Sequence, residues 1–109
     1  MNDTNNQRYD PENPIGTFEE KHVINMILFL KKNGKCKKTD IYFSISLNSR
    51  MATKLDRMEE AGLITQTLIG NTGRTDVELT PLGLQVADIL GELNDLLLPP
   101  KEPEDEIEA

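Results

Sequence analysis

Most of the chain consists of stretches in which apolar residues recur at helical spacing, and one shorter region is rich in Thr, Ile and Leu. Helical spacing gathers side chains on one face, whereas a strand alternates them between two faces. The first helical stretch covers 17–32 and stops at Asn33-Gly34, a pair typical of a helix C-terminus. Thr17 and Glu20 are expected to form a capping box at its start. Its stripe comprises Phe18, Val23, Met26, Ile27 and Leu30.

This first predicted helix is apolar around more of its circumference than one stripe requires. Ile24, Leu28 and Phe29 widen the apolar surface beyond a single face. A helix of this kind must be covered on more than one side. Two covers fit the pattern: a partner subunit, or the remaining helices of the same chain.

The pattern over 38–61 predicts a short helix, a turn at 44–47 and a longer helix over about 48–61, preceded by a strand stub at 35–36. The apolar face of the longer helix is made by Leu47, Met51, Leu55 and Met58. The residues expected to point away from that face are Asn48, Ser49, Arg50, Thr53, Lys54 and Arg57. Two helices joined in this way form a helix-turn-helix unit, whose second helix can enter the major groove of DNA.

The region 63–79 is predicted to be a β-hairpin, with strands at 63–69 and 76–79 and a loop at 70–75 that contains two glycines. Thr80-Pro81 then opens a last helix, with Thr at the N-cap and Pro at the first helical position. This helix is expected to end at Pro99-Pro100. Its main stripe is Leu82, Val86, Leu90, Leu93 and Leu97.

The predicted order α-β-α-α-β-β-α is mainly α with a small β-hairpin, an α+β arrangement typical of a winged helix-turn-helix domain. A chain of 109 residues suffices for one domain of this size. We expect a flexible arm at 1–16, the domain at 17–98 with dimerising terminal helices, and an acidic disordered tail at 99–109.

Three features of the sequence favour a cytoplasmic location for this domain. No apolar run approaches the roughly 20 residues that a membrane-spanning helix needs. The N-terminal sequence has neither a basic start nor an apolar core, so no signal peptide is expected. A single cysteine, Cys36, cannot form an internal disulfide, which fits a reducing compartment.

The net charge of −7 is unfavourable for contact with DNA, but it is unevenly distributed. Residues 31–57 carry eight lysines and arginines against two aspartates, a local charge of +6. The terminal segments 1–14 and 99–109 are acidic. Because the local field governs contact with a polyanion, the basic segment favours DNA binding at the helix-turn-helix despite the acidic total.

Three segments resemble the small MarR-like and ArsR-like winged-helix transcription regulators of bacteria and archaea. They are Leu-Asp-Arg-Met-Glu-Glu-Ala-Gly-Leu-Ile at 55–64, Gly73-Arg74, and Leu79-Thr80-Pro81-Leu82-Gly83. The resemblance covers roughly 17–98. It implies a transcriptional regulator that binds double-stranded DNA sequence-specifically as a homodimer. It also implies that the start of the third helix faces the major groove and that the wing, 70–75, approaches the minor groove.

The resemblance assigns DNA contacts to individual side chains. Arg50 is the best candidate for a base contact because a guanidinium can pair bidentately with guanine. Ser49 and Thr53 share its face, and Lys54 and Arg57 are candidates for phosphate contacts. Further candidates are Lys38, Thr39 and the wing residue Arg74. The competing interpretation is a solvated helix face and an ordinary exposed loop arginine.

Surplus apolar surface on the first and last helices predicts the dimer interface. Its expected members are Phe18, His22, Phe29, Leu93, Leu96 and Leu97. The net charge and the acidic tail motivate an alternative, a winged-helix module that binds protein and no longer binds DNA.

Catalytic and metal-binding motifs are missing from the sequence. One Cys and one His do not supply the clustered ligands of a transition-metal site, and no nucleophile or phosphate-loop motif is present. We therefore expect no enzyme activity, no metal and no cofactor. Cys36 is interpreted as a small strand residue, although Lys35 and Lys37 beside it are expected to lower its thiol pKa, which leaves a redox role open.

Overall fold

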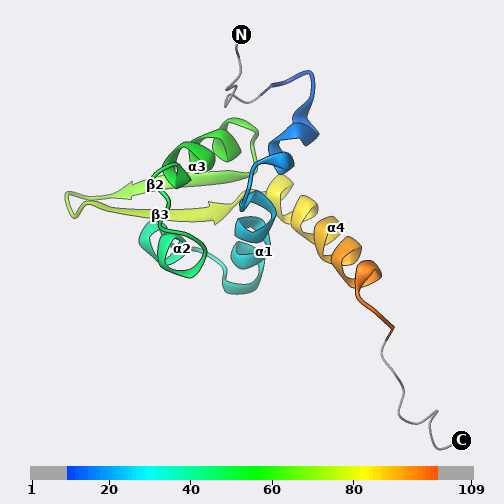
Figure 1. Cartoon of the computed structure of the whole chain (residues 1–109). Coiled ribbons are helices and arrows are strands. Elements are labelled where there is room, and N and C mark those ends of the chain that lie inside the picture. Colours follow the sequence, from blue (N-terminus) through cyan, green and yellow to red (C-terminus); the bar gives the residue numbers. More distant parts are fainter. Residues whose placement is uncertain (1–9, 101–109) are drawn as a thin grey trace, which may run out of the picture.

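Three helices and a three-stranded antiparallel sheet form the body of the protein, and a fourth helix extends away from it (Figure 1). The computed structural model describes residues 10–100; the predicted tail beyond 100 and residues 1–9 of the predicted arm lie outside them. The elements are the 3-10 helix η2 (Pro14–Glu19), α1 (Val23–Asn33), β1 (Cys36–Lys37), α2 (Lys38–Ser44), α3 (Met51–Glu60), β2 (Ile64–Ile69), β3 (Arg74–Leu79) and α4 (Pro81–Leu97). The order matches the predicted α-β-α-α-β-β-α.

The N-terminal region departs from the prediction of one helix over 17–32. The chain forms η2 and α1 separately, and His22 between them has a left-handed φ of 75°. The capping box predicted for Thr17 and Glu20 is therefore wrong. Thr17 is buried inside η2, and the Glu20 carboxylate pairs with Arg57 of α3. The Glu20 carboxylate, predicted from the local sequence to cap the helix, thus forms an ion pair with Arg57, which is remote in sequence.

The first helix is covered largely by the chain itself. Val23, Met26, Ile27 and Leu30 are at most 2% exposed, and α1 contacts η2, β3 and α4. Of its other apolar residues, Ile24 is 39% exposed. The chain's own elements thus provide the cover for the main stripe, which was the second of the two expected possibilities.

The helix-turn-helix forms as predicted, with a later start for its second helix. Three of the four residues of the predicted apolar face are confirmed, since Met51, Leu55 and Met58 are all 0% exposed; Leu47 is not, because it precedes α3 and is 70% exposed. Burying each of the three buried side chains contributes about 1.5–3 kcal/mol. Residues 48–50, expected to begin this helix, instead form a turn in which the Asn48 carboxamide oxygen accepts a hydrogen bond from the Arg50 N–H at 2.7 Å.

The sheet has the strand order β1-β3-β2. The hairpin register pairs Ile64 with Leu79 at its base and Ile69 with Arg74 at its end. Arg74 therefore belongs to strand β3, and the turn is shorter than the predicted loop over 70–75. Gly70 and Gly73 both have positive φ, as the tight turn of the wing requires.

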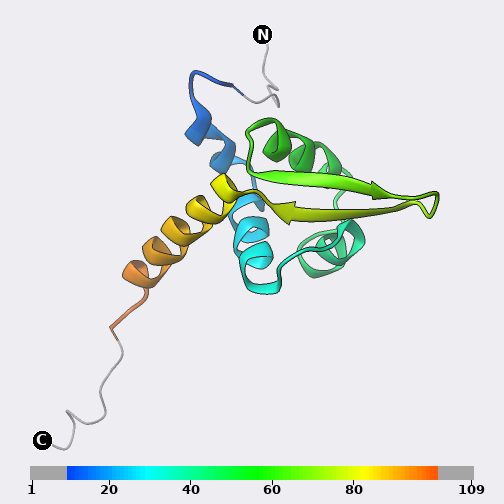
Figure 2. The ribbon, with the colours of Figure 1, turned by 180° about the vertical axis from the view of Figure 1, so that it is seen from behind.

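The start of α4 is fixed against the end of α3 and the hairpin. As predicted, Thr80 is the N-cap, and its hydroxyl accepts a hydrogen bond from the Gly83 N–H at 2.9 Å. A Cβ at Gly83 would overlap the carbonyl oxygen of Leu63, so only glycine allows this close approach. Beyond this anchored start, α4 leaves the body, and both views show its end on the side opposite to the wing tip (Figures 1 and 2).

No helix within residues 10–100 is long and apolar enough to cross a membrane.

Candidate nucleic-acid interface

The turn before α3 and the first turn of that helix present three residues predicted to face the major groove. Besides the Asn48–Arg50 bond, the Ser46 hydroxyl accepts a hydrogen bond from the Asn48 N–H at 3.1 Å. Ser49, Arg50 and Thr53 are all exposed. Side-chain hydrogen bonds to the backbone favour this kind of turn and fix the direction of the chain as it enters the helix. The structure thus places three of the predicted DNA-binding residues together on the surface at the start of α3.

Lys54 and Arg57 do not lie on that exposed face, and the prediction that they point to solvent is wrong. Lys54 is 8% exposed, and its ammonium donates a hydrogen bond to the Lys21 carbonyl oxygen at 3.0 Å. Arg57 is 4% exposed, and its guanidinium pairs with Glu20 at 2.9 Å. Both cations hold the junction between η2 and α1 against α3. The sequence pattern placed them away from the main stripe, but the N-terminal segment covers that second side of the helix.

The second half of α3 exposes acidic side chains. Asp56, Glu59 and Glu60 are exposed. The carboxamide of Gln66 on β2 donates hydrogen bonds to Asp56 and Glu59, both at 2.9 Å. The accessible charge of α3 is therefore positive before its first turn, at Arg50, and negative over its last turns. A polyanion would meet favourable charge only at the start of this helix.

A second group of basic residues surrounds a hollow of about 360 Å³ between the start of α2 and the wing. Its lining residues are Lys37, Lys38, Thr39, Tyr42, Thr72, Gly73, Arg74 and Thr75. The structure thus brings three predicted residues, Lys38, Thr39 and Arg74, to one place. Tyr42, Thr72 and Thr75 were not predicted as site residues. The pairing of β1 with β3, which no local pattern reveals, is what brings the two segments together.

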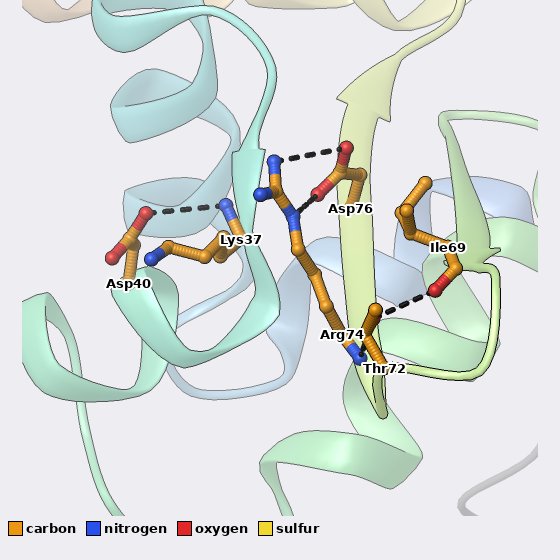
Figure 3. Close-up of polar contacts among 6 residues, drawn as sticks. All are labelled: Lys37, Asp40, Ile69, Thr72, Arg74 and Asp76. Carbon is orange, nitrogen blue, oxygen red and sulfur yellow. Dashed lines mark hydrogen bonds and ion pairs between the residues drawn. The ribbon is translucent and has the colours of Figure 1, made fainter.

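Arg74 does not extend from the wing tip. Its Nε donates a hydrogen bond to Asp76 Oδ1 at 2.7 Å and its Nη2 to Oδ2 at 3.4 Å, so the guanidinium lies back along β3, beside β1 (Figure 3). The hydrogen bond from Arg74 is the main cause that holds the pKa of Asp76 below its usual value. The same pair raises the pKa of Arg74. The Thr72 hydroxyl accepts a hydrogen bond from the Arg74 N–H at 3.0 Å and donates one to the Ile69 carbonyl at 2.7 Å, which ties the residue to the turn.

The residues predicted for a dimer interface fall into two groups. Phe18, His22 and Phe29 are partly buried, and both phenylalanines pack against the core of this chain. Burial, followed by the charges of Lys54 and Lys21, lowers the pKa of His22. Leu93, Leu96 and Leu97 on α4 are 47%, 78% and 74% exposed. Of these two predicted groups, the one on α4 has the more exposed apolar side chains.

The pKa of the Cys36 thiol is shifted in the direction opposite to the one expected. Burial raises its thiol pKa, and the carboxylates of Asp40 and Asp76 raise it further. The expectation that Lys35 and Lys37 would lower it is therefore wrong, because burial of the thiol, and then the two nearby carboxylates, act in the opposite direction. Among residues 10–100, no group of three or more His, Cys, Asp or Glu side chains could hold a metal ion.

The element order, the three-stranded sheet and the wing define a winged-helix fold. The chain is similar to the solved structure of reduced AbfR bound to DNA, with a TM-score of 0.62 and 20% identity, covering 89% of this chain and 72% of that chain. It is also similar to the structure of AbfR with its disulfide formed, with a TM-score of 0.62 and 21% identity, covering 81% of this chain and 67% of that chain. A transcriptional regulator homologue from Pyrococcus horikoshii OT3 is similar as well, with a TM-score of 0.55 and 18% identity, covering 77% of this chain and 97% of that chain. No protein-family model matches the sequence, and no curated protein matches it. At these identities the similarity establishes the fold.

Proposed function

We propose that this chain is a cytoplasmic, non-enzymatic transcription regulator of the MarR-like or ArsR-like kind, which binds double-stranded DNA sequence-specifically as a homodimer. The start of the third helix enters the major groove, and the wing lies near the minor groove. The observation that carries this proposal is the exposed group Ser49, Arg50 and Thr53 at the start of α3. A similar fold, that of reduced AbfR, has been solved with DNA bound.

In this proposal Arg50 reads a base and the exposed lysines contact phosphates. The inward positions of Lys54 and Arg57 remove both from the expected set of contacts. The lysines at the start of α2 take their place as the main source of positive charge. Affinity for DNA should therefore depend on the lysines at the start of α2 and on Arg50 at the start of α3. It should not depend on the side chains at the end of α3.

Dimerisation through α4 follows from its exposed apolar side chains. Ile89, Leu93, Leu96 and Leu97 are 47–78% exposed on a helix that leaves the body of the chain. Large exposed apolar patches mark protein–protein interaction sites. Because α4 ends opposite the wing tip (Figure 2), an interface on it leaves the wing accessible. Two recognition helices would then face half-sites about 34 Å apart.

The test is a binding titration with pooled genomic fragments at low salt. We expect affinity that falls steeply as salt rises, because phosphate contacts release counterions. Arg50→Ala should reduce the preference for a selected duplex over a scrambled one, with Glu60→Gln as the matched exposed control on the same helix. Light scattering at micromolar concentration should give the mass of a dimer. Absence of binding to any fragment would refute the DNA proposal, and a monomer would refute the dimer.

A second candidate function is a winged-helix module that binds protein. The exposed carboxylates Asp56, Glu59 and Glu60 favour it, because they would repel the DNA backbone. This alternative predicts that removing residues 99–109 uncovers no affinity for DNA. Strong, salt-sensitive DNA binding after truncation would contradict it.

A further inference from the structure

Two large apolar side chains of the helix-turn-helix lie outside the core. Phe43, near the end of α2, is 76% exposed, and Leu47, in the turn before α3, is 70% exposed. The sequence pattern had placed Leu47 on the buried face of the third helix. A single exposed leucine is ordinary on a protein surface, so its exposure alone assigns it no role. The backbone around Leu47 and the charges of its segment are more informative.

Side-chain hydrogen bonds fix the backbone on both sides of Leu47. The Ser46 hydroxyl accepts a hydrogen bond from the Asn48 N–H at 3.1 Å, so this bond spans Leu47. The Asn48 carboxamide oxygen then accepts one from the Arg50 N–H at 2.7 Å. Bonds of this kind restrict the conformations available to a turn. Leu47 is therefore exposed at a braced position, three residues before Arg50.

The charges near Leu47 in the chain favour contact with a polyanion. Residues 41–55 contain no Asp or Glu, and the exposed Arg50 lies among them. The exposed leucines of α4 differ, because Asp88, Glu92 and Asp95 alternate with them along that helix. A negatively charged partner would be repelled by the apolar surface of α4 and attracted to the segment that carries Leu47.

A DNA duplex offers few apolar groups to a leucine. The base edges in the major groove present hydrogen-bond donors and acceptors, together with the C5-methyl group of thymine. A leucine side chain has no donor or acceptor, so a base edge can be recognised by it only through that methyl group. Contact between the two removes apolar surface of both from water.

We propose that Leu47 is a specificity-determining residue that contacts the C5-methyl group of one thymine, in the same half-site as the base pair that Arg50 contacts. The inference rests on the proposed function and makes it more specific. It adds a residue of the turn to those of α3, and it adds an apolar determinant to the hydrogen-bonded readout by Arg50. The recognised half-site would then contain a thymine whose methyl group is part of the signal.

The test uses deoxyuridine, which lacks only the C5-methyl group of thymidine. In a duplex selected from genomic fragments by the wild-type protein, each thymidine is replaced in turn. Wild-type affinity should fall about three- to tenfold at one position, because one buried methyl group is lost. Leu47→Ala should bind the thymidine and deoxyuridine duplexes equally at that position. A wild-type protein insensitive to every replacement, or a preference kept by Leu47→Ala, would overturn the inference.

Thr53 also carries a methyl group on the exposed start of α3, so it provides a competing source of the same preference. Thr53→Ser removes that methyl group and should leave the preference for thymidine over deoxyuridine intact. Loss of the preference in Thr53→Ser would assign the contact to Thr53 and overturn the role of Leu47. The matched control is Leu84→Ala, a 49% exposed leucine on α4, which should bind both duplexes as the wild-type protein does.

Two further measurements separate this contact from other roles of Leu47. The salt slope of Leu47→Ala should equal that of wild type, because no charge is removed. Its mass in light scattering should also be unchanged; a loss of dimer mass would mean that Leu47 contacts a second copy, and would overturn the inference. Failure of the wild-type protein to bind any fragment would refute the proposed function itself. Specific binding without an effect of deoxyuridine would refute only the role of Leu47.

Discussion

Two groups of basic side chains in this protein look alike in sequence and differ in where their charges lie. Lys54 and Arg57 on α3 are nearly inaccessible and engage Lys21 and Glu20. Lys37, Lys38 and Arg74 surround an open hollow at the wing. The first group stabilises the junction of the N-terminal segment with the helix-turn-helix, and the second is available to a polyanion. The number of cations in a segment is therefore a poor guide to the number available to DNA.

The largest expected effect concerns Arg57. Arg57→Ala should lower the free energy of unfolding by about 2–3 kcal/mol, because it removes a buried ion pair and leaves Glu20 without its partner. This figure is below the usual cost for a fully buried pair, since the Glu20 side chain is 25% exposed. Urea unfolding measures the change. Arg50→Ala, an exposed control two turns earlier, should stay within about 0.5 kcal/mol of wild type.

The next effect concerns the wing lysines. The double variant Lys37→Ala, Lys38→Ala should lower DNA affinity about tenfold and reduce the salt slope by up to about two, as two phosphate contacts are lost. Its unfolding free energy should match that of wild type. An unchanged salt slope would mean that these lysines are exposed to solvent without contacting DNA. That result would contradict the difference drawn between the accessible and the buried basic groups.

Replacing Lys54 should have a smaller effect than replacing Arg57, and should change stability without changing DNA binding. Lys54→Ala should cost about 1–2 kcal/mol in unfolding free energy, because a nearly buried charged hydrogen bond to the Lys21 carbonyl is lost. Its salt slope for DNA should equal that of wild type. A reduced slope with unchanged stability would show that Lys54 leaves its buried position to contact phosphate.

Much of this arrangement could be predicted from local sequence. The α3 face formed by Met51, Leu55 and Met58 and the Thr80-Pro81 start of α4 depend on neighbours within a few residues, and both are as expected. The direction of Lys54 depends on a carbonyl 33 residues earlier in the chain. The left-handed backbone at His22, which breaks the predicted first helix, has no glycine to signal it.

Arg74 illustrates a different limit. Residues two positions apart share one face of a strand, so the pairing of Arg74 with Asp76 could have been predicted if both had been assigned to a strand. Assigning 70–75 to a loop concealed it. The raised pKa of Cys36 was missed for a related reason: its main cause is burial, followed by the charges of Asp40 and Asp76, whereas its sequence neighbours are lysines.

The smallest expected effect is a pH dependence. Because Arg74 lowers the native pKa of Asp76, its stabilising contribution is complete above the unfolded value of about 3.9 and disappears as pH falls through the native value. The stability difference between wild type and Asp76→Asn should thus stay constant between about pH 8 and 5 and shrink only below about 4. A difference that already shrinks above pH 5 would mean that the pair is not formed.

The most direct test of the central claim compares salt slopes of DNA binding in one series. In the proposed function, accessible cations, and not the number of cations in the segment, determine contact with DNA. Anisotropy titrations between about 50 and 200 mM salt should give a steep slope for wild type, the same slope for Lys54→Ala, and a shallower slope for the Lys37, Lys38 double variant. A slope that falls equally in both variants, or no binding at the lowest salt, would contradict the account.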